Sequence, residues 1–182
     1  ADLIAEKIRE KKPIRIIGDY DIDGVSATYI LLKGLRRVGA CASVKIPDRM
    51  KDGYGINIQI VEAAAGGNID TILTCDNGIS AIDQMKRARE LGMTVIVTDH
   101  HDIVKVGEED VLPEADAIVN PKQSADTYPW KEICGGMVAY KLIQILYEKA
   151  GIDREEWLAM IEFAAIATVG DVMKLQDENR IV

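Results

Sequence analysis

Acidic residues follow three separate apolar runs of this sequence. Residues 18–24 read GDYDIDG, residues 75–78 read CDNG, and residues 98–101 read TDHH. Each segment comes after a short apolar run of the kind that forms a buried strand. In open α/β sheets the carboxyl ends of parallel strands share one edge, and ligands bind there. Five aspartates and two histidines gathered at one edge would repel each other strongly without cations, so the pattern predicts a pair of divalent metals.

The spacing of Asp19, Asp21 and Asp23 also matches the start of an EF-hand calcium loop. That loop requires a bidentate glutamate at its twelfth position, whereas the twelfth residue counted from Asp19 is Ile30. The segment also follows a predicted strand rather than a helix. The EF-hand interpretation is therefore rejected.

The two histidines, His100 and His101, are adjacent and follow Asp99. Neighbours on an extended segment point in different directions, so one imidazole can bind metal while the other faces substrate. We expect Asp99 to orient one ring by accepting its N–H. Asp171 follows the apolar residues 165–170, and we expect it to close the metal site as a remote ligand.

The elements that must position these residues alternate along the chain. Apolar, β-rich runs predict strands at 14–17, 41–46, 70–74, 93–98 and 115–119. Helical periodicity predicts helices at 25–38, 56–65 and about 79–91, then one around Val138–Leu146 and one around Trp157–Thr168. This alternation predicts an α/β fold, a mostly parallel five-stranded sheet with helices on both faces.

Composition sets the broad class. Hydrophobic residues make up 48% of the 182 residues, which excludes intrinsic disorder. No apolar run approaches the ~20 residues of a membrane span, and no leader segment is visible. Three cysteines without a C-x-x-C pair argue against a disulfide framework or zinc ribbon and favour a reducing cytoplasm. The net charge of −8 is unusual for a nucleic-acid binder, but metal ions bound to carboxylates would cancel part of it.

Four motifs in order resemble the DHH phosphoesterase superfamily and, within it, the RecJ single-strand DNA exonucleases. They are GDYDIDG at 18–24, DNGI at 76–79, DHH at 99–101 and DVM at 171–173. The resemblance covers nearly the whole chain, so it implies a DHH catalytic domain over residues 1–182. It also implies that the C-terminal DHHA1 domain and nucleic-acid-binding domains of the family are absent from this chain. Lys174 stands where the family usually has proline, and residues 135–137 vary a stretch of small residues.

The resemblance implies two divalent cations, Mn²⁺ in the first place with Mg²⁺ as the alternative. Asp76 would bridge them, Asp21 and Asp19 would lie on one metal, and the other would be held by Asp23, His100 and Asp171. His101 would contact the scissile phosphate, with Asp99 as its catalytic companion. The expected substrate-binding residues are Arg49, Tyr54 and Asn77.

The implied function is metal-dependent phosphodiester hydrolysis, as a cytoplasmic 5′-to-3′ exonuclease on single-stranded DNA in DNA repair and recombination. A helicase or single-strand-binding protein is an implied partner through domains outside this chain. Alternatives within the superfamily are an oligoribonuclease, a cyclic-dinucleotide phosphodiesterase or a manganese pyrophosphatase. The DYDID form of the first motif, without the upstream histidine of those relatives, favours RecJ. A receiver-like signalling domain could use Asp76 and residues 120–122, but it leaves both histidines and Asp171 without a role.

Overall fold

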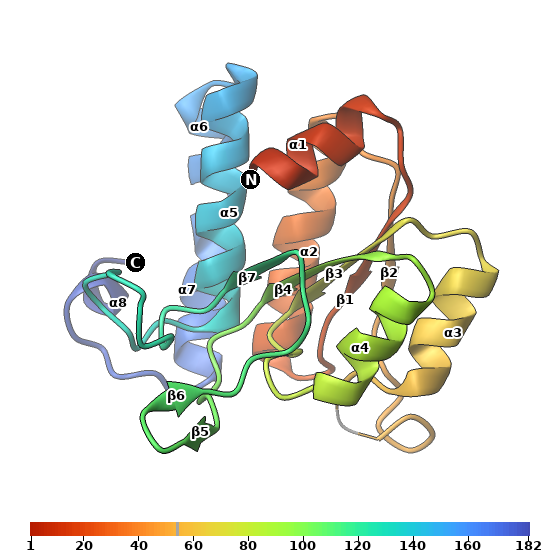
Figure 1. The fold of residues 1–182 in the computed structure, drawn as a ribbon. Coiled ribbons are helices and arrows are strands. Elements are labelled where there is room, and N and C mark those ends of the chain that lie inside the picture. The colour runs from red at the N-terminus through yellow and green to blue at the C-terminus, as the bar shows by residue number, and fades with distance from the viewer. Residues whose placement is uncertain (54) are drawn as a thin grey trace.

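Strands and helices alternate along the polypeptide (Figure 1). A computed structural model describes residues 1–53 and 55–182. The strands are β1 (Ile14–Ile17), β2 (Ala42–Lys45), β3 (Thr71–Cys75), β4 (Thr94–Thr98), β5 (Lys105–Val106), β6 (Glu109–Asp110) and β7 (Ala117–Val119). The helices are α1 (Asp2–Arg9), α2 (Ile22–Arg37), α3 (Ile58–Gly66), α4 (Ile82–Glu90), α5 (Gly135–Ala150), α6 (Arg154–Leu158), α7 (Ile161–Gly170) and α8 (Glu178–Ile181).

The main sheet has five parallel strands in the order β2-β1-β3-β4-β7. In the register, Ile16 lies opposite Val44 on one side and Leu73 on the other. The chain goes from β1 outward to β2 and then returns to the far side of β1 as β3. This order creates a switch point between β1 and β3, where crossover connections diverge and open α/β sheets bind ligands. The predicted fold class is confirmed.

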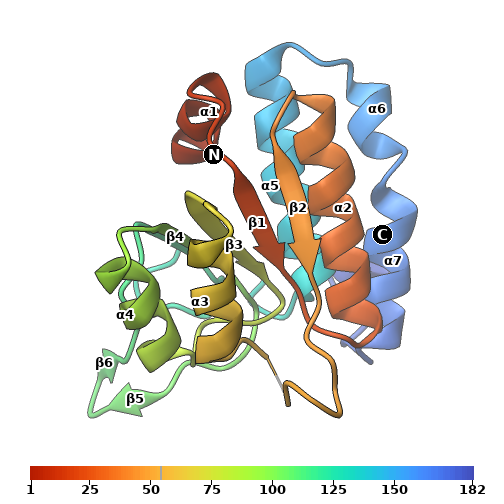
Figure 2. The ribbon, with the colours of Figure 1, turned by 90° about the vertical axis from the view of Figure 1, so that its right-hand side faces the viewer.

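Helices cover both faces of the sheet because side chains alternate along each strand (Figure 2). Ile16 and Leu73 enter a hydrophobic cluster with α2, α5 and α7. Ile17 and Ile72 enter a second cluster with α3 and α4 on the opposite face. Strands buried on both faces read as continuous apolar runs, as the sequence of β3 does.

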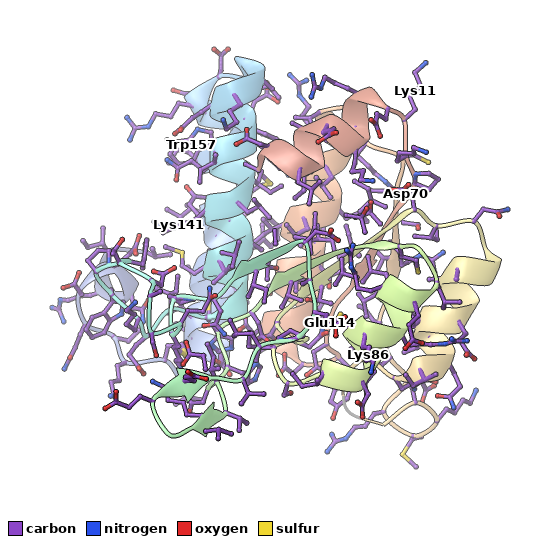
Figure 3. All side chains as sticks on the ribbon, viewed as in Figure 1. Lys11, Asp70, Lys86, Glu114, Lys141 and Trp157 are labelled. Atoms are coloured by element: carbon purple, nitrogen blue, oxygen red, sulfur yellow. The ribbon has the colours of Figure 1, made fainter. Side chains whose placement is uncertain are left out.

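Two of the differences from the predicted boundaries have local reasons. Helix α2 begins at Ile22 rather than 25, because the Asp21 side chain caps it by accepting the N–H of Gly24 at 2.8 Å. The single helix predicted around Trp157–Thr168 is two helices, α6 and α7. Between them the N–H of Met160 donates to the carbonyl of Trp157, a tighter turn than the α-helix has. Trp157 packs against Tyr140 of α5, with ring centroids 5.7 Å apart (Figure 3).

The prediction also missed the β5–β6 hairpin and the helix α8. Elements of two to four residues are too short to show a period in the sequence. Across the described residues, 1–53 and 55–182, no helix has both the length and the apolar character that crossing a bilayer requires.

Candidate metal centre

The carboxyl ends of β1, β3 and β4 bring the predicted acidic motifs to one place. Asp19 lies in the loop after β1, and Asp23 lies in the first turn of α2. Asp76 is the first residue after β3, and His100 follows β4. Asp171 comes from far along the chain, at the C-terminal end of α7. The site therefore depends on how α2 and α7 pack on the sheet.

The side chains form three groups of ligand atoms that could each hold a cation, with the atoms of a group all within 4.8 Å of one another. The groups are Asp19, Asp21 and Asp76; Asp23, His100 and Asp171; and Asp76, His100 and His101. The first two groups share no residue, and the third joins them through Asp76 and His100.

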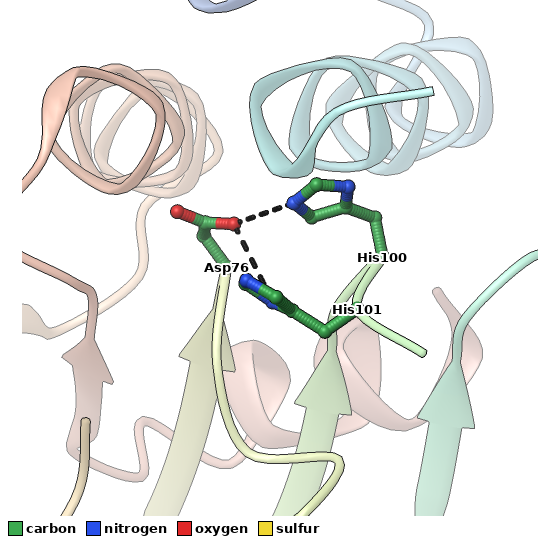
Figure 4. A group of neighbouring side chains, drawn as sticks. All are labelled: Asp76, His100 and His101. Atoms are coloured by element: carbon green, nitrogen blue, oxygen red, sulfur yellow. Dashed lines mark ion pairs between the residues drawn. The ribbon is translucent and has the colours of Figure 1, made fainter. Parts of the chain in front are cut away.

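The first two groups meet where the His100 ring approaches Asp76, and Figure 4 shows these two residues together with His101. The Nε2 atom of His100 lies 3.0 Å from Oδ1 of Asp76 and 3.4 Å from Oδ2 of Asp23. Oδ2 of Asp171 lies 3.7 Å away. Burial lowers the pKa of His100, against the raising effect of the Asp23 and Asp171 charges. A neutral imidazole is the form that binds a metal.

Asp76 has the surroundings expected of a bridging ligand. Its backbone adopts a left-handed conformation, φ +58°, which is uncommon outside glycine and aims the side chain into the site. Burial and then the charges of Asp23 and Asp21 raise its pKa to about 11. Neither carboxylate oxygen has a hydrogen-bond partner among the described residues, since the 3.0 Å approach of His100 lacks hydrogen-bond geometry.

Buried polar atoms without a hydrogen-bond partner show whether these residues fit a metal. Both ring nitrogens of His100, like both oxygens of Asp76, are buried without a hydrogen-bond partner in the part of the chain that the structure describes. Buried polar atoms are almost always satisfied, so such a cluster indicates a site for cations. Carboxylate and imidazole ligands without a thiolate suit Mn²⁺ or Mg²⁺. The residues fit two divalent cations.

His101 forms a pair with Asp99 beside this centre. Nδ1 of His101 lies 2.7 Å from Oδ1 of Asp99, and this hydrogen bond raises the pKa of the histidine although burial opposes the change. Burial also disfavours the charge of Asp99, but its hydrogen bonds with His101 and the N–H of Ile79 outweigh this and lower its pKa. The His101 side chain is 43% exposed, whereas Asp99 is buried. The pair therefore places an exposed histidine, oriented by a buried carboxylate, next to the metal ligands.

Two backbone groups that the sequence reasoning missed also reach the centre. The N–H of Gly135 donates to Oδ2 of Asp23 at 2.7 Å, and the N–H of Gly136 donates to Oδ1 at 2.6 Å. Both belong to the first turn of α5. The signal in the sequence was the Gly-Gly pair that opens an amphipathic helix.

Comparison with known proteins identifies the family. The model of the DHH family, N-terminal domain, matches residues 13–170. The chain belongs to the DHH family. This assignment excludes the receiver-domain interpretation.

The relatives of this DHH-family chain are longer proteins. It is 41% identical over 182 residues to the single-stranded-DNA-specific exonuclease RecJ of Bacillus subtilis strain 168 and spans 22% of that protein. A crystal structure described as exonuclease RecJ bound to manganese matches 99% of the chain with a TM-score of 0.87 and 34% identity, over 44% of its own length. RecJ of Thermus thermophilus in complex with Mn²⁺ matches 98% with a TM-score of 0.78 and 32% identity, over 24% of its length.

Two of the three predicted substrate contacts of the DHH-family chain, Arg49 and Asn77, belong to the described residues. Arg49, in the loop after β2, lies over the ring of Tyr20, 5.5 Å from its centroid. Asn77 is buried, and its side-chain N–H groups donate to the carbonyls of Ile17 and Cys75, so it braces the loop after β3. Tyr54 lies outside the described residues. A cavity of about 200 Å³ beside His101 is lined by Gly55, Ile56, Asn77, Gly78, Ser80, Ala81, Gln84 and Asp99.

Proposed function

We propose that residues 1–182 are the catalytic domain of a two-metal phosphodiesterase that degrades single-stranded DNA from its 5′ end. The observation that carries this proposal is the pair of ligand groups that meet at Asp76 and His100. The RecJ exonucleases to which the chain is 41% and 34% identical supply the substrate class. The proposed role is in DNA repair and recombination in the cytoplasm.

In this proposal each group holds one cation, Mn²⁺ by preference. The first would be held by Asp19, Asp21 and Asp76, and the second by Asp23, His100 and Asp171, with Asp76 shared between the two. When bound, two such cations lower the pKa of a water and stabilise the attacking and leaving oxygens of the phosphodiester. The chain contributes by holding the carboxylates close together despite their mutual repulsion.

His101 acts on the substrate in this proposal. The hydrogen bond with Asp99 raises the pKa of His101, which favours the protonated ring. In this form the ring can donate a hydrogen bond to a non-bridging oxygen of the scissile phosphate as negative charge develops. Asp99 accepts from Nδ1, and Nε2 is the ring nitrogen proposed to donate to the phosphate. Asp99 thus orients the ring and stabilises its protonated form.

Arg49, Tyr54 and Asn77 are the proposed substrate contacts. Arg49 stacks on the ring of Tyr20, which lies between the proposed ligands Asp19 and Asp21 in the sequence. A guanidinium in this position could bind the phosphate next to the scissile one. Further contacts to the strand, and partners such as a helicase or a single-strand-binding protein, are proposed for other domains of the longer RecJ architecture.

The test is hydrolysis by the purified chain of 5′-labelled and 3′-labelled single-stranded DNA with Mn²⁺, with Mg²⁺ or with EDTA. We expect nucleotides to be released from the 5′ end in Mn²⁺ and no release in EDTA. Duplex DNA, a short oligoribonucleotide, a cyclic dinucleotide and pyrophosphate are assayed in parallel. Faster turnover of one of these substrates than of single-stranded DNA would contradict the proposed specificity, and metal-independent cleavage would contradict the mechanism.

A further inference from the structure

The first turn of α5 lies inside the metal centre. Its two leading amides, of Gly135 and Gly136, each donate to a different oxygen of Asp23, at 2.7 and 2.6 Å. The carboxylate is buried, and it comes from a residue more than 110 positions earlier in the chain. One metal ligand is thus clamped by the backbone of a distant helix.

This contact replaces the usual cap of the helix. Cys134 occupies the N-cap position of α5 and makes no side-chain cap hydrogen bond. The first N–H groups of a helix have no partner within it, and its dipole favours negative charge there. Asp23 satisfies both requirements from α2, so the docking of α5 against α2 and the orientation of this ligand depend on each other.

The absence of side chains at both positions is also required by the geometry. A Cβ atom on Gly135 would lie 2.7 Å from both Cβ and Oδ1 of Asp76. A Cβ atom on Gly136 would lie 2.6 Å from the Cβ of Ala167 and 3.1 Å from Oδ1 of Asp23. The same helical turn therefore touches a ligand of each group.

We propose that Gly135 and Gly136 are positioning residues of the metal centre. Their amides fix the orientation of the Asp23 carboxylate, and the missing side chain of Gly135 leaves the space that the Asp76 carboxylate occupies. The clamp forms in the metal-free protein and prepares the ligands before a cation arrives. The part of this inference that concerns metal affinity rests on the proposed function; the clamp itself does not.

The first experiment compares Gly135→Ala with Gly66→Ala by Mn²⁺ titration, with free Mn²⁺ followed by electron paramagnetic resonance. Gly66 is the matched control, because it lies in the last turn of α3 with nothing within 4 Å of an added Cβ. We expect Gly135→Ala to bind Mn²⁺ about 10- to 100-fold more weakly. The Kd of Gly66→Ala for Mn²⁺ should stay within about twofold of the wild-type value.

Thermal unfolding without metal separates positioning from simple packing. If Gly135→Ala melts earlier but binds Mn²⁺ with wild-type affinity when folded, Gly135 serves only packing and the proposal is overturned. A loss of Mn²⁺ affinity in a variant that is folded by circular dichroism supports it.

The second experiment tests, without any metal, whether the Gly135 and Gly136 amides bind the Asp23 carboxylate. Its result is decisive even if Gly135→Ala does not fold or the wild-type protein binds no Mn²⁺. Amide hydrogen exchange of the metal-free wild-type protein should show protected N–H groups at Gly135 and Gly136. In Asp23→Ala these two amides should exchange about tenfold faster or more, with the middle of α5 little changed. Unprotected amides in wild type, or equal protection in the variant, would refute the clamp. If instead the clamp is present and Mn²⁺ does not bind, the proposed function alone fails.

Discussion

Val172 adopts a backbone conformation that valine rarely tolerates. It follows Asp171 at the end of α7, with φ +55° and a side chain that is 87% exposed. The N–H of Val172 donates to the carbonyl of Val169 at 3.1 Å, and the N–H of Met173 donates to that of Thr168 at 3.0 Å. These two bonds form a Schellman motif, in which the left-handed position is usually glycine. Val172→Gly should therefore stabilise the metal-free protein.

The size of the gain follows from two opposing effects. The left-handed conformation costs an L-residue roughly 1–2 kcal/mol, and glycine removes this cost. Glycine also makes the unfolded chain more flexible, which offsets about 0.4–1 kcal/mol. Little apolar burial is lost, because the Val172 side chain is exposed. The net gain is about 0.5–1 kcal/mol, and for a chain of this size it raises Tm by roughly 1–4 °C.

The assay is thermal unfolding in EDTA, followed by circular dichroism, on Val172→Gly and two controls. Val172→Ala keeps a Cβ atom in the left-handed conformation and should gain nothing comparable. Val169→Gly makes the same chemical change one turn earlier, inside the helix, where glycine is the poorer helix former by a few tenths of a kcal/mol, so Tm should fall. A lower Tm for Val172→Gly, or an equal rise for Val172→Ala, would refute the argument from backbone strain.

Three further predictions concern the proposed centre. His101→Ala should lower kcat by ~10²–10³ and keep its bound Mn²⁺; loss of metal in that variant, with retention in His100→Ala, would exchange the roles of the two histidines. Asp76→Ala should bind fewer than two Mn²⁺ ions by metal analysis, and a content of two ions would remove Asp76 as the bridge. The chain alone should show a high KM for single-stranded DNA, because its net charge is −8, while it hydrolyses a small chromogenic phosphodiester at a measurable kcat. Tight, processive degradation would show instead that these residues carry the whole binding groove.

Much of the fold and of the metal site follows from local sequence. Short apolar runs such as 14–17 and 70–74 have the length and composition of buried strands, and an aspartate follows each within two residues. Parallel strands necessarily bring such ends to the same edge, so the meeting of Asp19, Asp76 and His100 could be predicted before any packing was known. The adjacency of His100 and His101 likewise indicated separate roles, because neighbouring side chains on an extended segment diverge.

Other features were decided only by the tertiary structure. The sequence predicted Asp171 as a remote ligand, but its 3.7 Å approach to His100 depends on the packing of α7 against α2. The Gly135 and Gly136 amides, which the sequence reasoning missed, reach Asp23 because α5 packs against the same helix. Neither contact leaves a local period or spacing, since the partners are about 70 to 110 residues apart in the chain. The break between α6 and α7 and the strain at Val172 are similar cases. A sequence pattern shows which secondary structure a segment favours in isolation. These details depend instead on how α2, α5 and α7 pack on one face of the sheet. There, the burial of many side chains stabilises the fold by more than a tight turn or a strained residue costs.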